Sequence, residues 1–233
     1  MLPVTALPAD YDSDPDRFLS NERWPHDGVH PAVALRFQAA GAAVVLDVGG
    51  GYGRLARLLP EISIRCVLID LSPAMLALAP RPAVLADGAR LPVASGCADG
   101  VAALYTLYHY ADPLRPLGEA RRVLRSGGLL AACAPDRDSA PELAGVLPGW
   151  GAASTFDGED ALEIVSAVFS EPGDRVEQER WDGPFRILNS ADEAGGFLRA
   201  MGMSDAESCA AAAQLRLPLP LTMRGCFVYA TRG

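Results

Sequence analysis

Residues 44–56 constrain the fold of this chain more than any other stretch. Apolar residues and one acid, Asp47, run directly into a glycine cluster at positions 49, 50, 51 and 53. A short apolar run that ends in glycine predicts a buried parallel strand. Glycines allow a sharp turn and a close approach of the backbone to a ligand. A helix that begins near Arg54 would present unpaired N–H groups to that ligand. The stretch therefore predicts a strand–loop–helix pocket of the nucleotide-binding type.

The glycine spacing narrows the kind of nucleotide. A dinucleotide fingerprint, G-x-G-x-x-G, would need a glycine at position 54, where the chain has Arg54. The chain instead has Asp-x-Gly-x-Gly-x-Gly over residues 47–53, which resembles the first motif of the class I S-adenosylmethionine-dependent methyltransferases. In that family the glycine loop lies against the amino-acid part of the cofactor, and the acid reaches its ammonium group. The resemblance implies that Asp47, Gly49, Gly51 and Gly53 bind the cofactor.

A second acidic residue follows at the spacing that this family shows. Residues 65–70 predict a buried strand that ends in Asp70, 23 positions after Asp47. A carboxylate at the tip of the second strand can accept both hydroxyls of an adenosine ribose. Ser72 and Pro73 then predict the start of a helix. The text Asp-Leu-Ser-x-x-Met-Leu over 70–76 is similar to the family pattern and implies that Asp70 and Leu71 lie at the cofactor. The alternative for Asp70, an acid at a helix start, is disfavoured by the joint spacing.

The next segments continue the resemblance. Residues 83–86 predict a third strand, followed by Asp87 and Gly88. In the family, the acid at this position accepts from the adenine amino group, and the backbone N–H of the next residue supports the adenine ring. Residues 99–105 predict a fourth strand that ends at Tyr105, and we expect Tyr105 to be a further cofactor contact. Residues 114–125 have helical spacing, and residues 129–134 predict a fifth strand. Ser126 stands where the family usually has proline before a Gly-Gly pair.

The ordered set of motifs covers residues 44–134 and implies an α/β fold. The family has a Rossmann-like, seven-stranded, mostly parallel sheet with strand order 3-2-1-4-5-7-6, its last strand antiparallel, and helices on both faces. The resemblance is to the small-molecule, type 11-like branch. We expect one structural domain: an N-terminal helical lid over 1–43, with a helix near 31–40, and a methyltransferase core over 44–233. Substrate-cap insertions are expected around 135–170 and 185–220, with a strand at 174–181, a helix at 189–201 and a last strand at 226–230.

Composition excludes several classes. The net charge is −9 and every basic residue is arginine, without a cluster that would follow a phosphate backbone, so a nucleic-acid substrate is disfavoured. No apolar run reaches membrane-spanning length and no signal peptide is visible in residues 1–10, which predicts a cytoplasmic protein without membrane contact. Five scattered cysteines without a C-x-x-C pair, and only three histidines, predict neither disulfides nor a metal site.

Methyl transfer needs a nucleophile held in line with the methyl group at about 3 Å, in a pocket poor in water. A hydroxyl acceptor also calls for a base. His109 is the first candidate base, because the end of the fourth strand faces the methyl group in this family; a purely structural role is equally open. His26 and His30 are weaker candidates. Candidates for the substrate pocket are Tyr11, Trp24, Tyr108 and Tyr110.

The predicted function is methyl transfer from S-adenosyl-L-methionine to an O, N or C atom of a small molecule or modified peptide, with S-adenosyl-L-homocysteine as product. Secondary-metabolite or antibiotic biosynthesis is the expected setting, and the protein is expected to be a monomer or homodimer. Two alternatives stay open. One is a non-methylating enzyme, such as a cyclase, that keeps the cofactor as structure. The other is a cofactor-binding regulatory protein.

Overall fold

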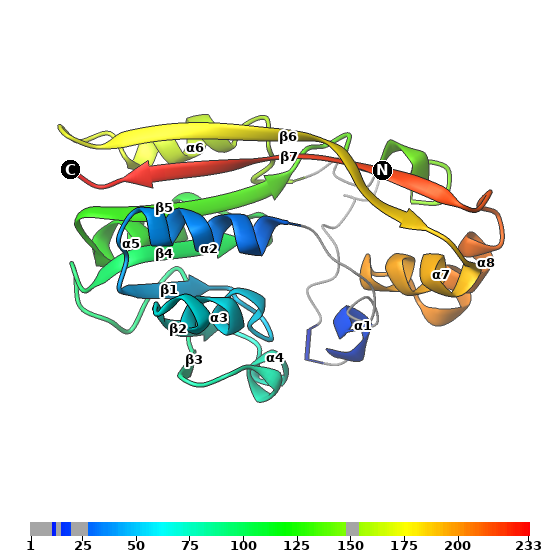
Figure 1. Cartoon of the computed structure of the whole chain (residues 1–233), viewed down its shortest axis with the longest axis horizontal. Coiled ribbons are helices and arrows are strands. Elements are labelled where there is room, and N and C mark those ends of the chain that lie inside the picture. The colour runs from blue at the N-terminus through cyan, green and yellow to red at the C-terminus, as the bar shows by residue number, and fades with distance from the viewer. Residues whose placement is uncertain (1–10, 13–14, 20–27, 148–153) are drawn as a thin grey trace.

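Seven strands form a single sheet with the order β3-β2-β1-β4-β5-β7-β6 in the computed structural model of the chain (Figure 1). The structure describes residues 11–12, 15–19, 28–147 and 154–233. The strands are β1 Val44–Val48, β2 Arg65–Asp70, β3 Ala83–Leu85, β4 Ala98–Leu104, β5 Leu124–Pro135, β6 Arg175–Leu188 and β7 Leu219–Thr231. This order confirms the predicted fold class.

Strand directions also agree with the prediction. The pairs β1–β2, β1–β4, β2–β3 and β4–β5 are parallel, and β7 is antiparallel to both of its neighbours, β5 and β6. The central strands are apolar on both faces because helices cover both. Val45 packs into the core on one face, and Leu46 into the core on the other.

Helices α2 Val29–Ala39 and α3 Arg54–Leu58 cover one face of the sheet, and α5 Leu114–Val123 and α6 Ala161–Val168 cover the other (Figure 1). Helix α2 begins two residues before the predicted start, so His30 lies in its first turn instead of in the preceding loop. Its Phe37 is fully buried against Gly100, where a Cβ would come within 2.6 Å of the ring. Residues 29–39 therefore pack as a core layer on the sheet. The N-terminal lid segment over residues 1–43 stays a prediction.

Strands β6 and β7 form an antiparallel pair, here called the β6–β7 hairpin, although two helices lie between them in the chain. Both strands are much longer than the strands predicted at 174–181 and 226–230. Its register runs from Arg175 opposite Thr231 to Leu188 opposite Leu219, with an irregularity after Pro184. Proline is tolerated there because β6 is the edge strand and its outer N–H positions need no partner. Strand β5 also begins earlier than predicted, directly after α5, because Ala98 of β4 pairs with Leu124.

The distal end of this hairpin carries two helices, α7 Ala191–Ala200 and α8 Asp205–Ala212 (Figure 1). They share a separate small core with the hairpin and the short helix η3 Pro141–Leu143, built around Leu143, Leu188, Phe197 and Leu221. The sequence predicted α7 but not α8. Short helix α1 Pro15–Leu19 contacts α7.

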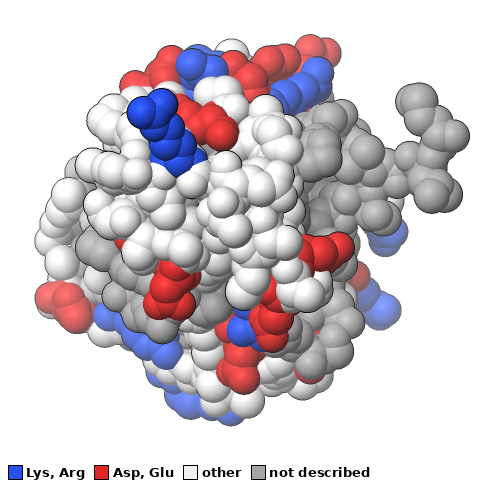
Figure 2. Space-filling model, turned by 90° about the vertical axis from the view of Figure 1, so that its right-hand side faces the viewer, with Lys and Arg blue, Asp and Glu red and all other residues white. Residues whose placement is uncertain are grey.

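The remaining short elements shape the loops between strands. They are η1 Leu59–Ile62 after α3, α4 Pro73–Leu78 after β2, and η2 Leu107–His109 after β4. Within the described ranges, no helix has the length and apolar character needed to cross a membrane. On the face shown in Figure 2, basic and acidic side chains are interspersed among uncharged residues.

Candidate functional site

A cavity of about 430 Å³ opens at the carboxyl ends of β1, β2 and β4. Ligands of open α/β sheets bind at this edge. Its walls include most of the predicted site: Tyr11, Gly49, Gly51, Asp70, Leu71, Asp87, Gly88, Tyr105, His109 and Tyr110. They also include residues that the sequence did not single out: Asp12, Ile69, Ser72, Met75, Ala86, Thr106 and Ala111. Ser72 and Met75 stand in the quoted family text over 70–76, so that text could have identified them as pocket residues.

The three glycines predicted at the cofactor have different roles in the loop. All have positive φ, at 68° for Gly49, 57° for Gly51 and 87° for Gly53. A Cβ on Gly49 would lie 2.1 Å from Thr106 Oγ1, and one on Gly53 would lie 2.5 Å from Pro80 Cδ, whereas one on Gly51 would meet nothing within 4 Å. Gly49 and Gly51 line the cavity; Gly53 does not, and it starts helix α3 from a left-handed conformation.

Asp47 lies behind the glycine loop instead of on the cavity wall. Its side chain is 2% exposed, and its Oδ2 atom has no hydrogen-bond partner among the described residues. Burial, followed by the nearby charge of Asp70, raises the pKa of Asp47 to about 7. Gly50 leaves room for the carboxylate, because a Cβ there would come within 2.5 Å of Oδ2. A buried acceptor without a partner beside a glycine loop fits the ammonium end of an amino-acid group.

Asp70 holds the glycine loop and the start of helix α4 together. Its Oδ2 accepts from the Gly51 N–H at 2.8 Å, and its Oδ1 accepts from the Ser72 N–H at 2.8 Å. Each carboxylate oxygen has a further lone pair, so the side chain can still accept from two hydroxyls. Ser72 caps α4 as predicted, since its Oγ accepts from the Met75 N–H.

Asp87, Gly88 and Tyr110 form the wall beyond β3. Asp87 Oδ1 accepts from the Ala89 N–H at 2.8 Å, which turns the chain at this point. A Cβ on Gly88 would lie 2.5 Å from the Tyr110 hydroxyl, so the phenol approaches the backbone closely. Burial raises the pKa of Tyr110 to about 12, and its hydroxyl stays neutral.

Residues 11 and 12 bridge two sides of the cavity. The Tyr11 hydroxyl lies 2.8 Å from His109 Nε2, at the β4 side. At the β2 side, Asp12 Oδ1 accepts from the Ser72 hydroxyl at 2.5 Å and from the Ala74 N–H at 3.2 Å. This pair of contacts places the described part of the N-terminal segment over the cavity.

His109 is half-buried and packs against its neighbours. Burial lowers the pKa of its imidazole to about 4, so the ring is neutral near pH 7. Its centroid lies 4.6 Å from that of Tyr108, which does not line the cavity. His30 also lies outside the cavity, with its ring centroid 6.4 Å from that of Tyr105. Trp24 and His26 lie outside the described residues.

Among the described residues, no group of three or more His, Cys, Asp or Glu side chains is placed so that it could hold a metal ion.

Part of the sequence is similar to known methyltransferases. The family model described as "Methyltransferase domain" matches residues 46–132. An uncharacterized methyltransferase of Mycobacterium tuberculosis is 36% identical over 104 residues, which is 42% of this chain and 42% of that protein. The chain thus matches less than half of the length of that relative.

Solved structures share the fold across nearly the whole chain. A putative methyltransferase from an antibiotic biosynthesis pathway of Anabaena variabilis superimposes with a TM-score of 0.70 and 15% identity, covering 91% of this chain and 99% of that one. The [4+2]-cyclase SpnF superimposes with a TM-score of 0.67 and 20% identity, covering 95% and 94%. Over residues 46–132 the chain thus matches a methyltransferase domain, and its sheet order and motifs are similar to those of the class I S-adenosylmethionine-dependent methyltransferases.

Proposed function

We propose that this protein transfers a methyl group from S-adenosylmethionine to a small molecule. The observation that carries the proposal is the cavity at the ends of β1, β2 and β4, in which the glycine loop meets Asp70 and Asp87. The cofactor supplies an electrophilic methyl group on a sulfonium. This chain's residues bind and orient it.

Each part of the cavity suits a part of the cofactor. Gly49 and Gly51 admit the amino-acid end close to the backbone, and Asp47 stands behind them as the acid nearest the ammonium group. Asp70, with Leu71 beside it, accepts from the ribose hydroxyls. Asp87 and Gly88 bind the adenine edge, with Tyr110 against the backbone there. Gly53 contributes through the turn that begins α3.

His109 is the proposed base at the reacting end. Because burial lowers its pKa to about 4, the imidazole is neutral at pH 7, which is the form that can accept a proton, although it is a weaker base than an ordinary histidine. The Tyr11 hydroxyl, 2.8 Å from Nε2, occupies the position that an acceptor hydroxyl would take. Rate enhancement then comes mainly from in-line positioning, with His109 passing the acceptor's proton onward. His30, beside Tyr105, is a weaker candidate, and His26 stays a prediction.

The proposed setting is secondary-metabolite biosynthesis in the cytoplasm, with a small molecule or peptide as the acceptor. The fold shared with a putative methyltransferase of an antibiotic pathway supports this setting. The fold shared with a [4+2]-cyclase keeps the second candidate, a non-methylating enzyme that retains the cofactor, in view.

Binding of S-adenosylhomocysteine, measured by isothermal titration calorimetry, tests the site. Asp70→Ala should lower the affinity at least tenfold, because ribose hydroxyls lose a charged acceptor. Glu61→Ala, at an exposed acid in η1 away from the cavity, is the matched control and should bind normally. Equal binding by Asp70→Ala and the wild type would refute the site.

Product analysis separates the two candidates. A panel of phenols, amines and carboxylic acids is incubated with S-adenosylmethionine, and S-adenosylhomocysteine is quantified. A methyltransferase forms it in equal amount to methylated product. An enzyme that converts a substrate while the cofactor stays intact is of the second kind.

A further inference from the structure

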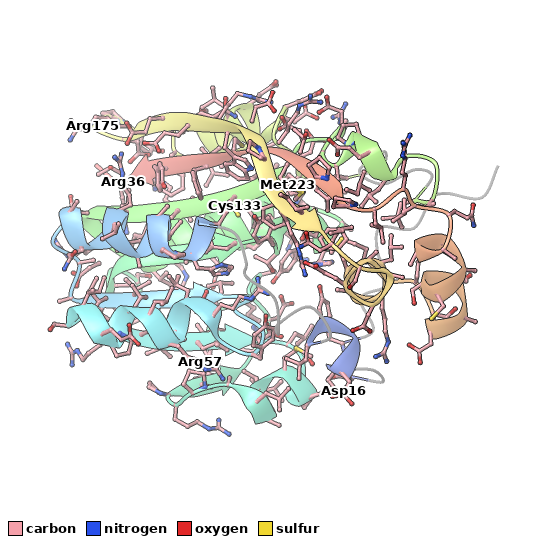
Figure 3. All side chains as sticks on the ribbon, turned by 45° about the vertical axis from the view of Figure 1, so that its right-hand side comes forward. Asp16, Arg36, Arg57, Cys133, Arg175 and Met223 are labelled. Atoms are coloured by element: carbon pink, nitrogen blue, oxygen red, sulfur yellow. The ribbon has the colours of Figure 1, made fainter. Side chains whose placement is uncertain are left out.

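A second cavity of about 250 Å³ lies next to the cofactor cavity. Tyr105, at the end of β4, lines both. The remaining walls come from the start of α2 and from the β6–β7 hairpin: Gly28, Val29, Ala32, Trp181, Asp182, Gly183, Pro184, Phe185, Met223 and Phe227. In Figure 3, Met223, which lines this cavity, lies toward the middle of the molecule. Arg36 marks the C-terminal end of α2, away from the start of the helix that lines the cavity. The sequence singled out none of these hairpin residues.

Aromatic rings dominate the hairpin wall. The Trp181 ring lies across β7 at Gly225, its partner in the strand register, where a Cβ would come within 2.4 Å of the indole. The same indole packs against Phe227 with ring centroids 4.7 Å apart. Gly225 thus lets a flat aromatic surface form beside the cavity. Such surfaces favour planar rings as ligands.

Charge is scarce in this cavity. Among its described lining residues only Asp182 is charged, and an oxygen of its carboxylate lies 3.2 Å from Arg224 Nε. No arginine lines the described walls, so an anionic ligand would find no countercharge there. The walls therefore suit a neutral ligand.

The backbone at Tyr105 is held in an unusual conformation between the two cavities. Its φ is +54°, a value that side-chain-bearing residues rarely adopt. The parallel sheet holds it, since the Tyr105 N–H donates to the Cys133 carbonyl at 3.3 Å. Strain of this kind, of about 1–3 kcal/mol, concentrates at functional sites. Here it sets a tyrosine at the junction of two cavities.

We propose that the second cavity binds the methyl acceptor, and that the acceptor is a neutral compound with a planar aromatic or conjugated ring. This inference rests on the proposed methyl transfer. The acceptor's hydroxyl or amine lies at the Tyr105 end, where the cavities meet. Its lone pair would form the bond to the methyl carbon as the carbon–sulfur bond breaks with its electron pair on sulfur, and the proposed base His109 would take the acceptor's proton and pass it to water.

Gly183 offers a direct test. It lines the second cavity, and a Cβ there would meet no atom within 4 Å, so Gly183→Leu fills the space without a clash. Gly118→Leu is the matched control, since Gly118 is exposed on α5 with the same open surroundings. Ala32→Phe fills the cavity from the α2 side and serves if Gly183→Leu does not fold.

The probe is 2-naphthol, titrated by calorimetry into protein saturated with S-adenosylhomocysteine. The wild type and Gly118→Leu should bind 2-naphthol equally. Gly183→Leu or Ala32→Phe should bind it at least tenfold more weakly than the wild type. The anion 2-naphthoate should bind the wild type more weakly than 2-naphthol does. Undiminished 2-naphthol binding in both cavity-filling variants, no binding to the wild type, or tighter binding of the anion would overturn the proposal.

S-Adenosylhomocysteine affinity is measured in every variant and should not change in Gly183→Leu. This control separates the two proposals. Failure of the wild type to bind S-adenosylhomocysteine refutes the methyltransferase site itself. Normal S-adenosylhomocysteine binding with any of the overturning naphthol results refutes only the assignment of the second cavity.

Discussion

Asp47 places a carboxyl group in the protein interior, where its charged form is disfavoured. Its carboxyl group is buried and one oxygen lacks a partner in the described structure. Because burial disfavours the charged form, the folded protein holds the proton up to about pH 7. A cationic group brought beside it would reverse that preference.

Protein stability should report this raised pKa. The folded pKa of Asp47, about 7, exceeds the ordinary aspartate value of 3.8, so the folded state binds this proton more tightly than the unfolded state. The contribution of this proton to the free energy of unfolding is complete below about pH 4 and is lost as the pH rises to 7. The loss is at most about 4 kcal/mol. Urea unfolding of the wild type and Asp47→Asn from pH 4 to 8 measures it.

The difference between the two proteins isolates Asp47. His109, whose lowered pKa gives stability the opposite slope with pH, is present in both proteins and cancels. The stability of the wild type relative to Asp47→Asn should fall between pH 4 and 7. A constant difference across this range would contradict the raised pKa.

Two glycines of the loop should respond differently to alanine. Both have positive φ, which alone costs about 1 kcal/mol for alanine. Gly49→Ala also drives its methyl group into Thr106 and should lose several kcal/mol in total, whereas Gly51→Ala should lose about 1 kcal/mol and mainly weaken S-adenosylhomocysteine binding. Denaturant unfolding and calorimetry, run on both variants, measure the two effects. Equal losses of stability would contradict the described contact with Thr106.

At the scale of elements, the first half of the chain could be predicted closely. Strand β2 and the Ser72 cap match the prediction because their signals are local: an apolar run, an acid, a serine and a proline. The predicted cavity residues share one edge of the sheet because parallel strands end there. The class of fold followed from the order of these motifs.

Other elements could not be predicted because their causes are not local. The length of β6 and β7 depends on pairing between residues up to 56 positions apart, as for Arg175 and Thr231. Helix α8 is alanine-rich and lacks a clear apolar stripe, although its Ser204–Glu207 capping box was readable. The second cavity forms only where α2 meets the hairpin, and no motif marks it.

The cap formed by α7, α8 and the distal hairpin contains a buried ion pair. Arg186 Nε donates to Glu193 Oε1 at 3.0 Å, and both side chains are under 10% exposed. Glu193 Oε2 also accepts from the Asn189 N–H, at the start of α7. Removing the acid takes the ion-pair partner from a buried guanidinium and an acceptor from the Asn189 N–H.

Glu193→Ala should therefore destabilise the cap by about 3–5 kcal/mol. Hydrogen exchange followed by mass spectrometry should show faster exchange over residues 185–215, with β1 and β4 unchanged. Asp192→Ala, next to it on the exposed side of α7, is the control. Unchanged exchange in the cap would show that the pair contributes little.

At the scale of the molecule, the described residues form two large cores on the two faces of one sheet and a third, smaller core in the cap. Figure 1 shows the cap at the end of the hairpin, beyond the central strands. Since the cap packs chiefly on its own small core, it is the region expected to open first.

Native-state hydrogen exchange in increasing urea should resolve this order. Amides of α7, α8 and the distal hairpin should exchange by an opening of lower free energy than amides of β1, β4 and β5. One common opening free energy for all these elements would contradict the division into separate cores.

One end of the paired strands β6 and β7 lies beside β5 in the central sheet, and the other end packs against the helices of the cap. Under the proposed methyl transfer, substitutions along β6 and β7 change the wall of the proposed acceptor cavity, while the proposed cofactor site at the ends of β1, β2 and β4 keeps its shape. If the methyl acceptor binds there, a change of acceptor can come from substitutions in these two strands, with the proposed methyl-donor site inherited unchanged.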